Sequence, residues 1–215
     1  KIKKKELIKT GYFYFDYLND KLSKITKSNE ILIAPSWNYN HKNYINENFE
    51  LIISSLLQKG FTVRFRPHPE VIKRSKAYLN EIKVRYSKAN FIYDDLPENL
   101  LSMEKANCLI TDNSAIAIEY ILILKKPALY FNDVDKIHNK NFDQFNDHYN
   151  MDNKIREKFG VTFNKNEIEK IDFIIKNAEV KFKDNKVEID DFLNQNFYNF
   201  GKTVIEFEKK IDEIL

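Results

Sequence analysis

The sequence predicts an α/β fold: a doubly wound parallel sheet of about six strands with helices on both faces. Two observations predict it. Short apolar segments alternate along the chain with longer segments whose apolar residues recur at helical spacing. The short segments are apolar at nearly every position, which is typical of strands buried on both faces of a parallel sheet.

Six apolar segments are expected to form the strands. They are residues 30–35, 61–65, 90–93, 108–110, 128–131 and 161–163. Pro35 ends the first of them, because proline has no N–H to donate to a sheet.

The segments between and around these strands are expected to be helical. The helices cover residues 16–27, 44–59, 71–87, 94–105, 114–126, 151–159, 166–178 and 202–215. Gly60 and Pro127 mark two helix ends, because glycine accepts the left-handed conformation that often follows a helix and proline cannot continue one. Residues 132–150 are polar and are expected to form a long loop, and residues 179–195 are highly charged and receive no assignment.

The stretch from Asn107 to Tyr130 is the unit around which the chain is organised. It predicts a strand, a polar turn at residues 111–114, an apolar helix and a second strand. The turn lies at the carboxyl end of a strand and the amino end of a helix, where free N–H groups and the helix dipole favour an anion such as phosphate. Asp112, Asn113 and Ser114 are also common helix N-caps, so plain capping is the alternative.

Two other polar clusters are expected to meet this turn. In the usual strand order 3-2-1-4-5-6, the winding reverses between the first and fourth strands, and ligands bind outside the carboxyl ends there. The first strand is followed by Ser36 and the second by Arg66 and His68. The prolines on either side of His68 stiffen its loop. We therefore expect Ser36, Arg66, His68 and Ser114 to converge on a phosphate-binding pocket.

Composition limits the remaining possibilities. The chain has 215 residues, 43% of them hydrophobic, and a formal net charge of only +3 with interleaved signs, which argues against a nucleic-acid partner. Cys108 is the only cysteine, so a reducing, cytoplasmic compartment is expected. No apolar run reaches the roughly 18 residues of a membrane span. The lysines within residues 1–5 form either a solvated end or a peripheral contact with an anionic membrane.

Several ligand motifs are absent or weak. The glycine-rich dinucleotide fingerprint does not follow the first strand, and no Walker loop is present. His138 and His148 lie among aspartates of the expected loop, but their spacing fits no known metal cage, so no metal is expected and a solvated loop is favoured.

A series of short motifs resembles the CDP-glycerol glycerophosphotransferases, the teichoic acid and capsule polymerases of GT-B type. In chain order they are Gly11-Tyr12 with Asp16, Ala34-Pro35-Ser36-Trp37, Arg66-Pro67-His68-Pro69, Ile110 to Ser114 with Glu119-Tyr120, Lys126-Pro127, and Asn196 to Thr203. The similarity covers nearly the whole chain. It implies that residues 29–215 are the Rossmann-like nucleotide-donor-binding domain of a GT-B protein, preceded in residues 1–28 by a linker and a leading helix.

The resemblance also implies roles for individual residues. His68, Asp112 and Ser114 match the residues that bind or activate the diphosphate of a CDP-linked donor, and Glu119 is placed to accept hydrogen bonds from ribose hydroxyls. Asn113 stands where the family usually has tyrosine. Other departures from the family are Ala115 for a second serine, Asn38 for an arginine, and Phe13-Tyr14 for a proline-arginine pair. These changes concern the transferred group more than the nucleotide.

The family's activity sets the remaining expectations. The donor is a substrate, so no cofactor is expected, and the acceptor is a polysaccharide or a polyol phosphate at the cell envelope. A GT-B active site lies between two domains, and the amino-terminal acceptor domain is not in this sequence, so we expect a fragment that binds a cytidine nucleotide but turns over poorly alone. A peripheral position at the inner face of the membrane is expected. Two alternatives stay open, a nucleotide-sugar epimerase and a non-catalytic binding domain.

Overall fold

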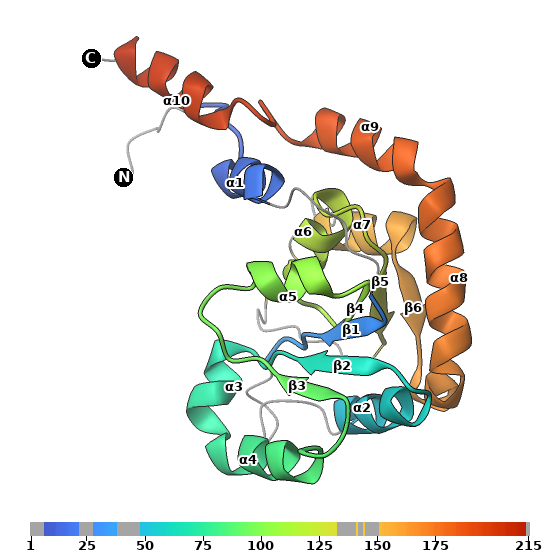
Figure 1. Ribbon diagram of the computed structural model, residues 1–215. Coiled ribbons are helices and arrows are strands. Elements are labelled where there is room, and N and C mark those ends of the chain that lie inside the picture. Colours follow the sequence, from blue (N-terminus) through green and yellow to red (C-terminus); the bar gives the residue numbers. More distant parts are fainter. Residues whose placement is uncertain are drawn as a thin grey trace.

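The computed structural model describes residues 7–21, 28–37, 48–132, 141, 144 and 151–213. Its centre is a sheet of six parallel strands in the order β3-β2-β1-β4-β5-β6 (Figure 1). The strands are β1 (Glu30–Ile33), β2 (Thr62–Phe65), β3 (Phe91–Tyr93), β4 (Cys108–Thr111), β5 (Ala128–Phe131) and β6 (Val161–Phe163). The doubly wound fold and the strand order predicted from the sequence are both confirmed.

The register brings the carboxyl ends of the central strands level. Ile33 of β1 is paired with Phe65 of β2 on one side and with Ile110 of β4 on the other. Phe65 is in turn paired with Tyr93 of β3. The segments that follow these four strands therefore emerge at one edge of the sheet, where the winding reverses between β1 and β4.

Helices cover both faces of the sheet. They are α1 (Phe13–Lys21), α2 (Asn48–Gln58), α3 (Pro69–Arg74), α4 (Lys76–Arg85), α5 (Leu100–Lys105), α6 (Ile116–Leu122), α7 (Met151–Phe159), the 3₁₀ helix η3 (Lys165–Lys170), α8 (Ile171–Asp184), α9 (Lys186–Asn196) and α10 (Thr203–Asp212). One apolar core joins the sheet to α2, α4 and α8, and the other joins it to α1, α5, α6, α7 and α9. Alternate residues of β1 serve the two cores: Ile31 and Ile33 face the first and Leu32 the second.

Three expected helices differ from the observed ones in the first half of the chain. The helix expected at residues 71–87 is two helices, α3 and α4, which meet at Ser75. The helix expected from residue 94 begins only at Leu100. Asp94 is instead buried before it and accepts hydrogen bonds from Arg64 and Arg66. The leading helix begins at Phe13 and buries Phe15 and Leu18 in the second core.

The second half also differs from expectation. The apolar helix after β4 is α6, which begins at Ile116 and has Ala115, not Ser114, at its N-cap position. The helix expected at residues 166–178 starts as the 3₁₀ helix η3 and continues as α8 to Asp184. The charged stretch 179–195, which had no assignment, is helical and places Ile189 and Leu193 in the second core.

The two ends of the described chain are tied together. Both carboxylate oxygens of Asp16 accept backbone hydrogen bonds at the start of α10, from Gly201 at 2.8 Å and Thr203 at 2.9 Å. Gly11 has φ +107°, and a Cβ there would collide with the carbonyl of Tyr198 and the side chain of Thr203. In Figure 1, α1 and α10 accordingly lie side by side at the upper edge of the molecule. No described helix is long and apolar enough to cross a bilayer.

Candidate functional site

A pocket of about 450 Å³ lies at the edge where the carboxyl ends of β1 to β4 meet. Segments distant in sequence supply its walls: the ends of β1 and β2, the segment after β3, the turn after β4, and α1. Its lining residues are Tyr14, Tyr17, Ala34, Pro35, Arg66, Pro67, His68, Pro69, Pro97, Glu98, Asn99, Leu100, Ser114 and Ile116. Arg66, His68 and Ser114, three of the residues selected from the sequence, thus share one cavity.

His68 is held at the pocket by the first turn of α3. Its Nδ1 accepts a hydrogen bond from the backbone N–H of Glu70 at 3.1 Å, and Pro69 occupies the first helical position. Its ring lies nearly parallel to that of Trp37, with centroids 6.2 Å apart and planes 29° apart. Because Nδ1 is an acceptor here, the proton of the neutral imidazole is on Nε2, which is then a hydrogen-bond donor.

Arg66 lines the same pocket but is already paired. Its Nη1 lies 2.9 Å from Oδ1 of Asp94, and its Nη2 donates to the carbonyl of Leu96 at 2.8 Å. The side chain is only 14% exposed. Asp94 therefore fixes the guanidinium at the pocket wall and lowers the net positive charge that Arg66 presents to a ligand.

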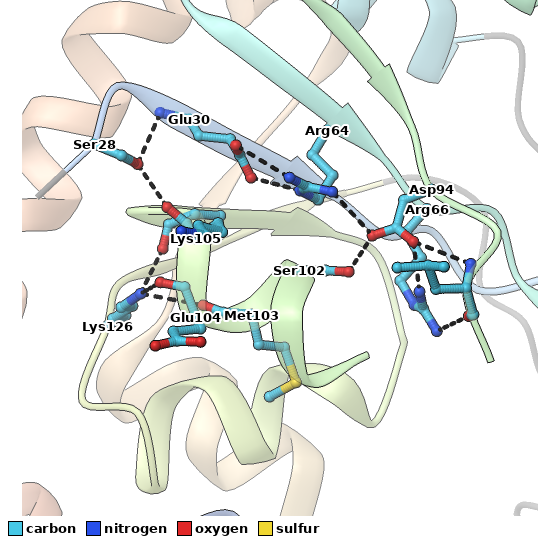
Figure 2. A network of polar contacts seen from close by, with 12 residues as sticks. Ser28, Glu30, Arg64, Arg66, Asp94, Ser102, Met103, Glu104, Lys105 and Lys126 are labelled. Carbon is cyan, nitrogen blue, oxygen red and sulfur yellow. Dashed lines mark hydrogen bonds and ion pairs between the residues drawn. The ribbon is translucent and has the colours of Figure 1, made fainter. Parts of the chain in front are cut away.

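Asp94 is the centre of a buried polar network, shown in Figure 2. Its fully buried carboxylate contacts Arg64 and Arg66 and accepts a hydrogen bond from Ser102 of α5. Arg64 in turn contacts Glu30 of β1 through Nε at 2.5 Å and Nη2 at 3.3 Å. The network joins β1, β2, the end of β3 and α5, and reaches the pocket through Arg66.

The turn after β4 is tied to the end of β1. Oδ1 of the buried Asp112 accepts a hydrogen bond from the backbone N–H of Ser36 at 2.8 Å, and the Thr111 hydroxyl donates to the carbonyl of Ala34 at 2.7 Å. Asp112 thus holds two corners of the pocket together. Ser36 lies beside the pocket and does not line it, whereas Ser114 does.

Asn113 and Glu119, like Ser36 and Asp112, lie outside the pocket lining. Asn113 is exposed, and its Oδ1 accepts a hydrogen bond from Nη1 of Arg156 at 2.9 Å. Glu119 contacts the pocket residue Asn99: Nδ2 of Asn99 lies 3.5 Å from Oε2 of Glu119. Burial raises the pKa of Glu119 to about 7.

The sequence reasoning missed Tyr14, Tyr17 and Asn99 as pocket residues. Tyr14 and Tyr17 are one helical turn apart on α1, and Asn99 precedes α5. The sequence could have indicated Asn99, because Asn99 follows the third strand, and that strand neighbours the second in the expected order. No sequence signal indicated Tyr14 and Tyr17, because nothing local shows that α1 folds back over the sheet edge.

A sequence profile of the CDP-glycerol:poly(glycerophosphate) glycerophosphotransferases matches residues 1–168, which is most of the 215 residues. The chain belongs to this family. The resemblance found in the short motifs is thereby confirmed. No curated protein sequence matches the chain.

Solved structures show the same fold in longer proteins. The wall teichoic acid polymerase TagF is 18% identical over 94% of this chain and 49% of its own, with a TM-score of 0.52. A single-residue variant of TagF is 19% identical over 94% and 48%, with a TM-score of 0.55. UDP-GlcNAc 2-epimerase from Methanocaldococcus jannaschii is 15% identical over 95% and 54%, with a TM-score of 0.52. At these identities the likeness is one of fold, the GT-B type, and this glycerophosphotransferase-family chain spans about half of each structure.

Among the residues that the structure describes, no group of three or more His, Cys, Asp or Glu side chains is arranged to hold a metal ion. His138 and His148, whose loop was weighed as a metal site, lie outside the described residues.

The raised pKa of Glu119 predicts that the stability of the protein depends on pH. Its pKa of about 7 is above the ordinary value of 4.5, so the folded state holds an extra proton between these values, and the associated stability is lost as the pH rises through 7. Relative to wild type, the Glu119→Gln variant is therefore expected to gain about 1–3 kcal/mol in free energy of unfolding between pH 5 and pH 8. Urea denaturation of wild type and variant at both values measures this.

The control is Glu81→Gln, an exposed glutamate on α4. A stability difference for Glu119→Gln that is the same at pH 5 and pH 8 would contradict a raised pKa.

Proposed function

We propose that this chain is the donor-binding half of a transferase that uses CDP-glycerol or a similar nucleotide-activated donor. The observation that carries the proposal is the single pocket in which Arg66, His68 and Ser114, from three different strand ends, line the point where the sheet winding reverses. In open α/β sheets, ligands bind at this point. Family membership supports the choice of a CDP-linked donor.

In this proposal the donor diphosphate lies against those three side chains. Nε2–H of His68 and the hydroxyl of Ser114 donate to phosphate oxygens, and Arg66 adds positive charge. Because Nδ1 of His68 accepts the Glu70 N–H, a second ring proton would have to displace that hydrogen bond. His68 therefore acts as a neutral donor that stabilises the negative charge developing on the leaving nucleotide, rather than as an imidazolium acid.

The transferred group and the acceptor belong to the same proposal. A polyol phosphate or a glycosyl group passes to a polysaccharide or teichoic-acid-type acceptor, which a second domain binds. The chain alone binds the donor without turning it over. We place the protein in the cytoplasm, at the inner face of the membrane where such an acceptor grows.

Titration calorimetry with the 215-residue chain tests donor binding. CDP is expected to bind, and Ser114→Ala is expected to weaken binding by about 10- to 100-fold, because one hydrogen bond to a charged oxygen is lost. Ser87→Ala is the matched control, since that exposed hydroxyl donates within its own turn, to the carbonyl of Val84. No heat with CDP while another nucleotide binds would refute the cytidine assignment, and UDP binding in its place would favour an epimerase-like donor.

A further inference from the structure

Two aromatic rings of α1 form part of the pocket wall. Tyr14 and Tyr17 both line the cavity, and their rings are nearly parallel, with planes 18° apart and centroids 6.0 Å apart. The opposite side of α1 is anchored, because Phe15 and Leu18 are buried in the second core. The two rings are therefore held in place by the fold.

Tyr14 is fixed further by a side-chain hydrogen bond. Its hydroxyl donates to Oδ1 of Asn99 at 3.0 Å, and Asn99 also lines the pocket. Burial and the nearby Glu119 raise the pKa of Tyr14, so its phenol stays neutral at physiological pH. Tyr17 is 41% exposed and thus still presents much of its surface.

The pocket combines aromatic and polar side chains from different elements. Tyr14 and Tyr17 come from α1, and His68 directly precedes the first turn of α3. In Figure 1, α1 and α3 lie on opposite sides of α5, with α1 above it and α3 below. A nucleoside diphosphate likewise combines a planar base at one end with charged oxygens at the other.

We propose that Tyr17, supported by Tyr14, is the stacking platform for the nucleobase of the donor. Every nucleobase has a π-face, and stacking on an aromatic side chain is a strong, sequence-tolerant contact. This inference rests on the proposed function, because the diphosphate must occupy the His68 side for the base to reach α1. It adds a base-stacking residue, Tyr17, that the family motifs quoted above do not contain.

Calorimetry with CDP and the 215-residue chain tests the platform. Tyr17→Ala is expected to weaken CDP binding about tenfold, the loss of one base-stacking contact, whereas Tyr17→Phe keeps the affinity because stacking needs the ring and not the hydroxyl. Phe13→Ala is the matched control: it is 66% exposed on the same helix and does not line the pocket.

Proton NMR of CDP gives a readout specific to stacking. The H5 and H6 resonances of cytosine are expected to shift upfield on binding to wild type and less on binding to Tyr17→Ala. Unchanged affinity in Tyr17→Ala, or unshifted base protons in wild type, would overturn the platform while leaving donor binding intact. Absence of binding by wild type to both CDP and UDP would overturn the platform and the proposed function together.

Discussion

Replacing His68 with Asn is expected to lower the transfer rate of the proposed two-domain transferase by about 10²–10³-fold, the usual cost of removing one donor to a developing anion. The Oδ1 of asparagine can take the place of Nδ1 and keep the hydrogen bond from Glu70, so α3 remains capped. What is lost is the Nε2–H group. Transfer of radiolabel from CDP-glycerol to a polyol-phosphate acceptor measures the effect.

His68→Gln is the matched variant. The amide nitrogen of glutamine lies near the position of Nε2 and still donates, so this variant is expected to keep more activity than His68→Asn. If both variants lose activity equally, a neutral hydrogen-bond donor is the wrong role and proton transfer is favoured. If both keep the wild-type rate, His68 does not take part in the reaction.

Replacing Asp94 with Asn is expected to lower the free energy of unfolding by about 3–5 kcal/mol, because the change removes the charge that two buried guanidinium groups share. Arg64 and Arg66 are 11% and 14% exposed, so water cannot replace the lost partner at little cost. Urea denaturation measures this as a lower transition midpoint at an unchanged slope. The effect should also reach the pocket, because Asp94 orients Arg66.

Asp95→Asn makes the same chemical change one residue later. The Asp95 carboxylate is 54% exposed and lies 3.6 Å from Lys83, so its loss is expected to change stability by less than about 1 kcal/mol. Equal losses in the two variants would show that the network around Asp94 contributes nothing beyond an ordinary surface charge.

The polar corners of the site were only partly predictable. Arg66, His68 and Ser114 were found because each follows a predicted strand, and parallel strands place their carboxyl ends at one edge. Their detailed roles were not visible. Asp112 reads as a helix cap or a phosphate contact in the sequence, yet in the structure it is buried and holds the backbone of Ser36. That partner is 76 residues away, and no local signal reports such a contact.

The sequence by itself determined the fold class, the positions of the strands and the corner where the pocket lies, because runs of buried apolar residues, glycine stops and proline stops act within a few residues of one another. Only the tertiary structure decided where α5 and α6 begin, how Asp94 is shared between two arginines, and that Tyr14 and Tyr17 face the pocket. These features arise from burial and pairing between residues far apart in the chain, whose energies outweigh local helix and turn preferences.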